Sequence, residues 1–323
     1  MIKEKSSVPE IWTHNLTKIY GKGESSVKAV IKIDISIEPG VHGFLGPNGA
    51  GKTSTINMLI GAISITDGEA KIRGEAAGSL RARRIIGFLP QDPAFYDNMS
   101  GEQYLNYIGE LSGLRRGKAK KKTLEMLQKL ELLDARDRRI EKYSEGMKQR
   151  IGIAAALIHE PEILILDEPT SNLDPIGRKN IINDIIALST DVSVFVSSHI
   201  LSEIEQMCVN VTMINRGKIV LTDTIKNIKK MHTLKAGHNI IILDTNSNEK
   251  VIQKLKEKDF ITNTWIDESD KKIHIMPKDT EKLQKAIPKM IIDNDVILRE
   301  FYQPETSLQD IFIEIMEEEV NNE

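Results

Sequence analysis

Apolar and polar residues alternate along a stretch near the beginning of the chain. The apolar positions are Ile31, Ile33, Ile35 and Ile37, and the polar positions between them are Lys32, Asp34, Ser36 and Glu38. A period of two residues is typical of a strand that buries one face and exposes the other. We therefore expect residues 10–38 to belong to a half-buried antiparallel sheet, which Gly40 ends.

Two largely apolar runs further along the chain, Ile163–Leu166 and Val192–Val196, predict buried parallel strands. Helical patterns separate them, and one of these patterns begins with a capping box formed by Ser100 and Gln103. The alternation of strands and helices predicts an α/β core over residues 10–225. We expect this core to carry an antiparallel β subdomain and a helical insertion at about residues 92–158.

The pattern of apolar and polar residues changes near residue 238, after a segment at 226–237 that we interpret as a linker. Residues 238–323 predict a small C-terminal α+β accessory domain in the order βαββαβα, which is typical of a ferredoxin-like fold. The expected strands lie at 240–243, 260–266, 273–276 and 296–301, and the expected helices at 248–258, 280–289 and from Ser307.

Composition narrows the class of protein. The chain has 323 residues, which is enough for about two domains. Its 44 basic and 47 acidic residues leave a formal charge of −3, which argues against a protein whose whole surface coats nucleic acid. The single cysteine, Cys208, excludes a disulfide framework within one chain. With no signal sequence and no long apolar run, we expect a cytoplasmic protein.

A glycine-rich segment carries the strongest chemical signal. The residues Gly46, Pro47, Asn48, Gly49, Ala50, Gly51, Lys52 and Thr53 match the P-loop pattern, and we count Ser54, which follows, with the nucleotide-binding segment. Glycines allow backbone N–H groups to surround phosphate oxygens, and the next helix directs its positive end at them. Lys52 can reach the β- and γ-phosphates, and Thr53 can ligate Mg²⁺. The alternative is a glycine-rich turn that binds nothing.

A pair of carboxylates, Asp167 and Glu168, follows the buried run that begins at Ile163. Consecutive side chains on a strand diverge, so the two acids are expected to have different tasks. We expect Asp167 to lie on the Mg²⁺ side of the site and Glu168 to act as the base for the attacking water. A solvated pair or a helix N-cap is the alternative.

Together these motifs resemble the nucleotide-binding subunit of an ATP-binding cassette (ABC) transporter over residues 10 to about 225. The motifs occur in the order of that family. They are an adenine-stacking aromatic at Tyr20, the P-loop, the Q-loop at Gln91, the signature at Tyr143–Arg150, the Walker B pair, the D-loop at Ser171–Asp174 and the switch histidine His199.

The resemblance implies a role for each matching residue. Ser144 and Gly146 would contact ATP bound to a second chain placed head to tail, and Gln91 would contact Mg²⁺ or the attacking water. His199 would donate to the γ-phosphate. The expected catalytic set is Glu168, His199, Gln91 and Lys52, and the expected metal ligands are Thr53, Gln91 and Asp167. A surface loop amide at Gln91 and ordinary sheet packing at Tyr20 are the alternatives.

Two positions depart from the family pattern. Glu145 stands where the signature usually has glycine, and we expect its carboxylate to face away from the nucleotide because like charges repel in a desolvated site. Asn172 replaces the usual D-loop glycine, and asparagine tolerates left-handed backbone angles better than other residues with a side chain.

The resemblance implies an ATPase that pairs with a second copy of itself or with another cassette around MgATP and drives a separate membrane permease. The chain would then lie peripherally at the cytoplasmic face of the membrane. Residues Ser307–Phe312 are similar to the S-L-x-D-x-F tail of bacterial drug, bacitracin and lantibiotic exporter ATPases, which favours export. A soluble ABC ATPase of translation or DNA repair is the alternative, and so is a binding module with little turnover.

A basic run at 115–122 could contact phospholipid headgroups or nucleic acid, but it contains no aromatic residue. A solvated helix start is the interpretation we favour, and no nucleic-acid partner is expected.

Overall fold

The computed structural model describes residues 8–235, 240–304, 307–309 and 311–313. The chain divides into two compact units, Met1–Ile225 and Lys226–Glu323. Each unit has its own sheets and helices, so each is described by itself.

An antiparallel sheet forms one part of the N-terminal unit, with strand order β2-β1-β4-β5. Its strands are β1 (Ile11–Tyr20), β2 (Val27–Ile37), β4 (Asp67–Ile72) and β5 (Glu75–Ala76). The alternation predicted for β2 is confirmed, because Ile33, Ile35 and Ile37 are buried and the polar residues between them are exposed. Ile31 is half-buried, since a bulge at Lys32, whose φ is 47°, interrupts the pleat.

A second sheet of six strands, ordered β10-β9-β3-β8-β7-β6, lies at the centre of this unit. The strands are β3 (Val41–Leu45), β6 (Ile86–Leu89), β7 (Ile163–Asp167), β8 (Ser193–Ser198), β9 (Asn210–Asn215) and β10 (Lys218–Thr224). All neighbours are parallel except the β9–β10 hairpin. The carboxyl ends of β3, β7 and β8 therefore meet at one edge, which is where α/β sheets bind ligands.

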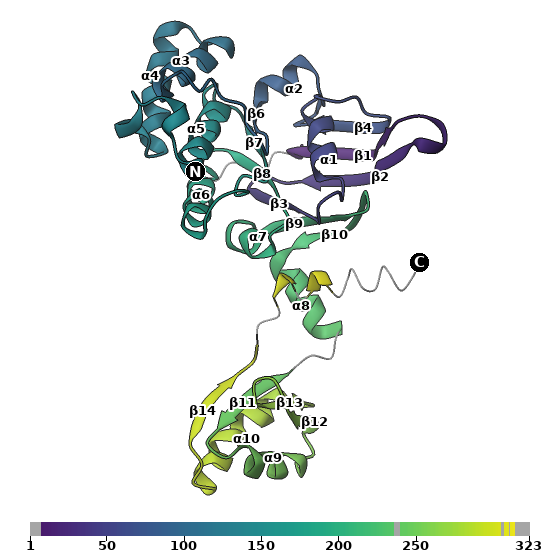
Figure 1. Ribbon diagram of the computed structural model, residues 1–323. Coiled ribbons are helices and arrows are strands. Elements are labelled where there is room, and N and C mark those ends of the chain that lie inside the picture. Colours follow the sequence, from purple (N-terminus) through teal and green to yellow (C-terminus); the bar gives the residue numbers. More distant parts are fainter. Residues whose placement is uncertain (1–7, 236–239, 305–306, 310, 314–323) are drawn as a thin grey trace. The chain divides into compact units, whose positions relative to one another are not determined.

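Helices surround these sheets, as Figure 1 shows. They are α1 (Lys52–Leu59), α2 (Leu80–Ile85), α5 (Glu145–Leu157), α6 (Pro175–Leu188) and α7 (Leu201–Met207). The helical insertion adds α3 (Gly101–Leu111) and α4 (Arg116–Lys129), which pack together away from the antiparallel sheet (Figure 1). The predicted capping box is present, because the Ser100 hydroxyl and the Gln103 amide each bond to the other residue's backbone. The predicted α/β fold with a helical insertion is confirmed.

The C-terminal unit begins with a helix where we expected a linker. Helix α8 (Ile225–Lys235) spans most of residues 226–237, the segment that we interpreted as a linker, so that segment is helical over this stretch. The physical reason is visible in the sequence: no glycine or proline occurs between Ile225 and Lys235, and Ile225, Ile228 and Met231 follow helical spacing.

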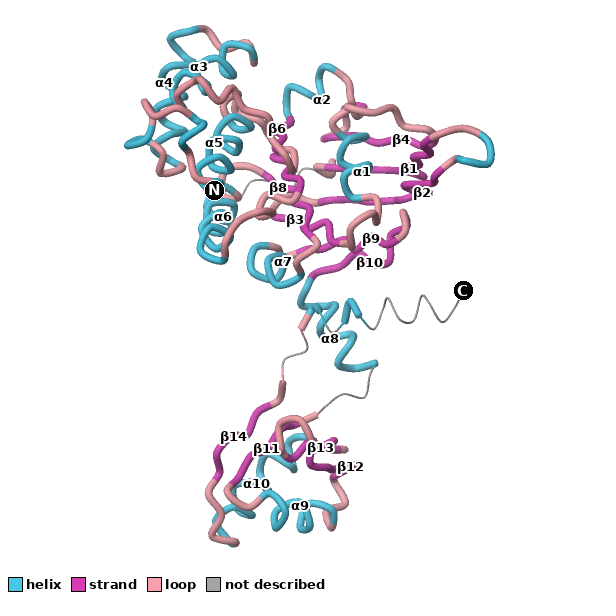
Figure 2. The backbone as a smooth tube through the Cα atoms, viewed as in Figure 1, coloured by secondary structure: helices cyan, strands magenta, loops and turns pink. Residues whose placement is uncertain are grey.

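A four-stranded antiparallel sheet with order β12-β13-β11-β14 follows in this unit (Figure 2). In chain order the elements are β11 (Ile241–Thr245), α9 (Asn248–Lys256), β12 (Ile261–Ile266), β13 (Ile273–Pro277), α10 (Thr280–Asp293) and β14 (Leu298–Tyr302). This connectivity is ferredoxin-like, as predicted. Of the expected last helix, only 307–309 and 311–313 are among the described residues.

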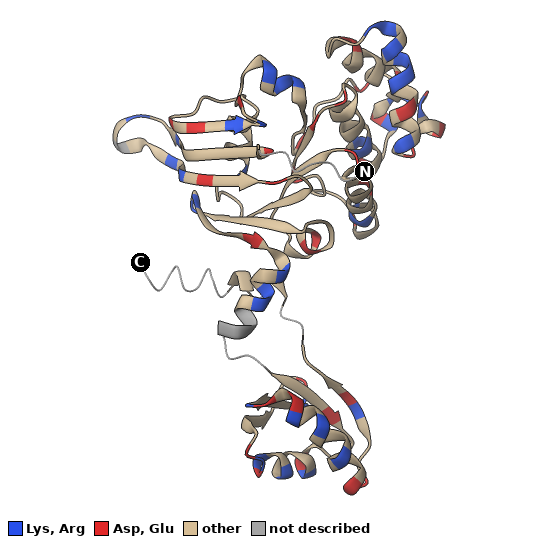
Figure 3. Cartoon of the chain, turned by 180° about the vertical axis from the view of Figure 1, so that it is seen from behind, with Lys and Arg blue, Asp and Glu red and all other residues tan. Residues whose placement is uncertain are grey.

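The basic run of the helical insertion is partly neutralised. Lys118 and Lys122 on α4 lie 2.9 and 2.8 Å from the carboxylate of Glu160, and Lys122 also contacts Glu125 at 2.7 Å. Hydrogen bonds from Lys122 and Lys118 lower the pKa of Glu160 to about 2. Most of the basic residues at 115–122 are exposed, which agrees with the interpretation of a solvated helix start, and the lysine and arginine positions of this region are coloured blue in Figure 3.

Candidate nucleotide-binding site

The P-loop connects β3 to α1 and has a backbone that requires glycine. Gly49 and Gly51 have φ values of 80° and 110°. A Cβ atom at Gly51 would lie 2.6 Å from the carbonyl oxygen of Ala29, and one at Gly46 would lie 2.3 Å from that of Ile214. Because these contacts are with backbone atoms, neither position can carry a side chain without moving a strand.

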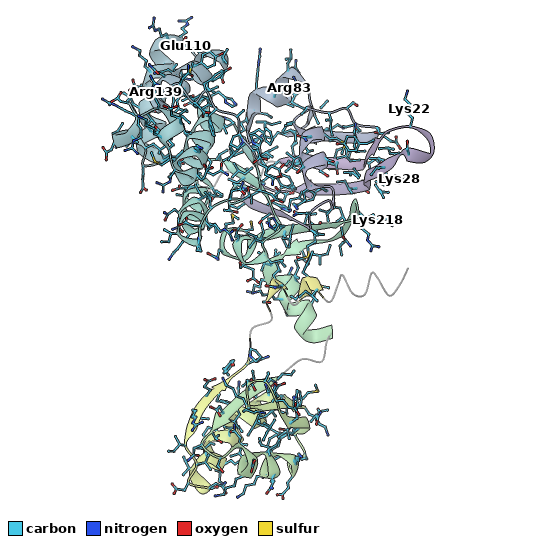
Figure 4. All side chains as sticks on the ribbon, viewed as in Figure 1. Lys22, Lys28, Arg83, Glu110, Arg139 and Lys218 are labelled. Carbon is cyan, nitrogen blue, oxygen red and sulfur yellow. The ribbon has the colours of Figure 1, made fainter. Side chains whose placement is uncertain are left out.

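The far end of α1 is also held in place. Gly61 adopts a φ of 73°, and its carbonyl accepts a hydrogen bond of 2.9 Å from the guanidinium of Arg83, labelled in Figure 4. Helix α1, which begins at Lys52 directly after the loop, is therefore fixed at both ends.

Lys52 is a buried cation with polar contacts on several sides. Its side chain is 5% exposed, and its Nζ donates to the carbonyls of Gly46 at 2.7 Å and Pro47 at 3.2 Å. The same ammonium lies 3.1 Å from Oε1 of Glu168, whose side chain is 8% exposed. A buried ion pair with these additional hydrogen bonds holds the cation inside the loop that is expected to bind phosphate.

The Walker B carboxylates diverge at the end of β7. Ser197 of β8 donates to Oδ1 of Asp167 at 2.5 Å and accepts from the backbone N–H of Glu168 at 2.9 Å. Glu168 has a φ of 48°, an uncommon angle for a residue with a side chain. Such angles persist where the surrounding structure enforces them, and here the serine and the buried pair with Lys52 do so.

His199 contacts the same glutamate from the opposite side. Its Nδ1 lies 2.9 Å from Oε2 of Glu168, and its ring is 40% exposed. The two carboxylate oxygens of Glu168 thus contact Lys52 and His199, and these two partners lie far from it and from each other in the sequence.

Tyr20 lies beside the beginning of α1. Its ring is exposed, its hydroxyl lies 3.2 Å from Oγ of Ser54, and the Nζ of Lys18 lies 5.1 Å from the ring centre. The hydroxyl contact places this exposed ring beside the first turn of α1, directly after the P-loop.

The signature segment is located on the surface of its own chain. Ser144 is exposed and is the N-cap of α5, where its hydroxyl accepts from the backbone N–H of Met147 at 3.3 Å. A Cβ at Gly146 would meet no atom within 4 Å. The start of a helix with small residues and open space is suited to an anion supplied from outside the chain.

Glu145 forms an ion pair on its own helix, since its Oε1 lies 2.9 Å from Nζ of Lys148 and its side chain is 62% exposed. Asn172 of the D-loop has a φ of 65°, which lies in the left-handed region. Asparagine adopts this conformation more readily than other residues with a side chain, so it can stand in place of the usual glycine.

Gln91 is exposed shortly after β6. It lines a depression of about 430 Å³ together with the start of α5 and the D-loop, whose contributions are Glu145, Lys148, Gln149, Ser171, Asn172 and Leu173. The structure therefore places Gln91 with the signature and the D-loop, while Lys52, Glu168 and His199 form a separate cluster joined by direct contacts.

Some residues that organise the site were not anticipated from the sequence. Ser197 supports both Walker B acids, and the Gln149 side chain of α5 donates to the carbonyl of Pro169 at 2.7 Å. In the sequence, Ser197 is only the first residue of the Ser-Ser-His run and Gln149 only one residue of the signature, so neither position indicated a supporting role. Their partners lie at least 20 residues away, so no local pattern indicated the contacts.

The residues expected to hold Mg²⁺ fit its chemistry. Thr53, Gln91 and Asp167 offer a hydroxyl, an amide and a carboxylate oxygen, the hard ligands that Mg²⁺ selects. The described part of the chain contains no cluster of three His, Cys, Asp or Glu side chains that would form a metal cage. Mg²⁺ usually binds through one or two protein oxygens together with phosphates and water.

A family model described as ABC transporter matches residues 31–171. The chain is 36% identical over 272 residues to the uncharacterized ABC transporter ATP-binding protein YxlF of Bacillus subtilis (strain 168), covering 84% of this chain and 88% of that protein. It is 35% identical to the bacitracin transport ATP-binding protein BcrA of Bacillus licheniformis, covering 95% and 97%. The linearmycin resistance ATP-binding protein LnrL of Bacillus subtilis (strain 168) is 31% identical, with 93% and 96% covered.

Among solved structures, the chain is similar to the ATP-binding cassette MJ0796, determined as a dimer in a post-hydrolysis state with ADP and Pi. The TM-score is 0.60 at 23% identity, and the match covers 67% of this chain and 98% of that one. This similarity supports the fold of the N-terminal unit.

The fold and the P-loop site define a nucleotide-binding ATPase core. The chain belongs to the family of ABC transporter ATP-binding proteins, as the relatives matched over nearly their whole length show. It is an ATP-binding ABC subunit and an ATPase. In the described residues, no helix is both long and apolar enough to cross a bilayer.

Proposed function

We propose that two copies of this chain close head to tail around two MgATP, hydrolyse them, and drive a separate membrane permease that exports a membrane-active antibiotic or peptide. The observation that carries the proposal is the contrast between a buried Lys52–Glu168 cluster and an exposed N-cap at Ser144. One chain carries both the P-loop half and the signature half of a nucleotide site. Because Ser144 of the signature is exposed to solvent, it can contact a nucleotide bound to the P-loop of a second chain.

The residues in contact suggest the division of labour. Glu168 would accept a proton from the attacking water, and His199, already 2.9 Å from that carboxylate, would hold it in place and donate to the γ-phosphate. Lys52 would exchange its contact with Glu168 for phosphate oxygens, which frees the carboxylate to act as a base when ATP is bound. The helix start at Ser144 would stabilise the transferred phosphoryl charge from the partner chain.

Mg²⁺ would be held by Thr53, Asp167 and Gln91, and it would neutralise charge on the phosphates when bound. Gln91 would couple the occupancy of the nucleotide site to the D-loop and α5, since it lines one depression together with them. The same depression continues along Asp92, Pro93 and Phe95 of the helical insertion, and it is the surface where we propose that the permease docks.

Mixing two inactive variants tests the composite site. Lys52→Ala removes the phosphate ligand and Ser144→Arg blocks the signature, so each variant alone has two defective sites. In an equal mixture, half of the dimers are mixed, and each has one intact site of its two, so hydrolysis should recover to about one quarter of the wild-type rate. A mixture no more active than its components would contradict the composite site.

The proposal of export rests on relatives that carry the C-terminal unit as well as the cassette, including the bacitracin transport protein BcrA. In the cell that encodes this chain, replacing it with the Glu168→Gln variant should raise susceptibility to the exported compound in a panel that includes bacitracin and linearmycin. The matched control is Glu162→Gln, an exposed carboxylate before β7. Equal susceptibility of all strains across the panel would contradict this assignment of cargo class.

A further inference from the structure

A buried carboxylate outside the motifs lies beside the catalytic cluster. Glu203, on α7, is 4% exposed. Its Oε2 accepts hydrogen bonds from the hydroxyls of Thr170 at 2.6 Å and Ser198 at 3.1 Å. Its Oε1 is buried with no hydrogen-bond partner in the described residues. Burying a carboxylate is costly, so its presence at this position requires an explanation.

The two donors belong to the two loops that carry the reacting groups. Thr170 comes two residues after Glu168 in the loop that follows β7, and Ser198 directly precedes His199 at the end of β8. The strands themselves are paired in register, with Asp167 opposite Ser197. Beyond this last pair the ladder ends, and Glu203 joins the loops where the sheet no longer does.

The contacts form a closed ring. It passes from Glu168 along the chain to Thr170, across Glu203 to Ser198, and through His199 back to Glu168 at 2.9 Å. The backbone N–H of Ile200 also donates to the Ser198 hydroxyl at 2.9 Å. The two residues that flank His199 are therefore bonded to each other, and Ser198 is bonded to Glu203 as well. Loss of one link would allow the His199 loop to move relative to the glutamate.

We propose that Glu203 is a positioning residue for ATP hydrolysis, which holds the His199 loop against the Glu168 loop through Thr170 and Ser198. An ionised acceptor forms stronger and shorter hydrogen bonds than a neutral one, so one oxygen can hold two hydroxyls. An amide in its place could put an N–H donor where Oε1 has no hydrogen-bond partner among the described residues. The inference rests on the proposed roles of Glu168 and His199.

The first test compares turnover with nucleotide binding. Glu203→Gln should lower kcat about tenfold, the scale of a displaced catalytic group, while the Kd for a fluorescent ATP analogue changes less than about twofold. Glu203→Asp should restore part of kcat because it keeps the charge. Glu205→Gln, the same change two residues along α7, is the matched control and should leave both quantities unchanged. A kcat for Glu203→Gln within twofold of wild type would overturn the proposal.

The second test separates positioning from general support of the fold. In a His199→Ala background, Glu203→Gln should change the remaining kcat by less than about twofold, because the group it positions is gone. The same tenfold loss in both backgrounds would show a structural role and overturn the proposal. If Glu203→Gln does not fold, Thr170→Val and Ser198→Ala remove the donors singly and are measured in the same two backgrounds. Wild-type turnover in Glu168→Gln would instead contradict the proposed function itself.

Discussion

The two halves of the nucleotide site lie at different depths in one chain. In the P-loop and Walker B half, Lys52 and Glu168 are buried and contact one another at 3.1 Å. In the signature half, Ser144 is exposed and bonds only to its own helix start in the contacts that the structure shows. The first half is organised by tertiary contacts, whereas the second is organised by a single helix cap.

This difference indicates how the chain divides its work. Buried charges are stable only when they are paired, and Glu168 is held by Lys52, His199 and Ser197 within its own chain. The free N–H groups at an exposed helix start are solvated in a single chain, and they can bind phosphate when a second chain brings its nucleotide. Changes to the two halves should therefore differ in kind, with the first affecting chemistry and the second affecting assembly.

The largest effect is expected in the buried half. Glu168→Gln keeps the shape of the side chain but removes the base, so kcat should fall about 100-fold or more while ATP binding persists. Phosphate release and the binding of a fluorescent ATP analogue measure the two quantities. The control is Glu162→Gln, which changes an exposed carboxylate paired with Arg73. Turnover within tenfold of wild type would contradict the assignment of the base.

A change of the exposed half should separate binding from assembly. Ser144→Arg should lower hydrolysis about 50-fold, because a bulky cation blocks the helix start from the partner's nucleotide. ATP binding by a single chain and thermal stability should remain at wild-type values, as measured by titration and by thermal melting. Ser112→Arg, at the exposed end of α3, is the control. Loss of ATP binding by the Ser144→Arg monomer would show that the serine acts within its own chain.

The D-loop allows a smaller test through the backbone. Asn172 has a φ of 65°, so Asn172→Val should strain this turn and lower kcat about fivefold, since β-branched residues disfavour that region. Asn172→Gly, which is free of that strain, should stay within about twofold of wild type. Equal activity of the valine and glycine variants would indicate that the left-handed conformation has no part in turnover.

The smallest effect is expected at Glu145, which is paired with Lys148 on its own helix. Glu145→Gly should change the ATP concentration for half-maximal dimerisation by less than about twofold, because surface ion pairs contribute little. Sedimentation at low and high salt is the measurement, with Glu141→Gly as the control. A severalfold tightening at low salt would show that the Glu145 carboxylate faces the nucleotide.

Local patterns predicted much of the fold. The capping box at Ser100 and the ferredoxin-like element order followed from residues within a few positions of one another. The helix at Ile225–Lys235 was not predicted, although its apolar residues follow helical spacing. The ring through Ser198, Thr170 and Glu203 could not be predicted, since its members come from three separate elements.

The sequence by itself determined the type of chemistry and the local backbone that supports it. Glycines at 46, 49 and 51 permit the phosphate loop, and serine at 144 begins a helix, because both properties depend on neighbouring atoms. Only the tertiary structure decided which acid meets which cation, and that Ser144 is exposed while Lys52 is buried. Burial and long-range pairing depend on how strands β3, β7 and β8 are ordered in the sheet, and no local pattern encodes that order.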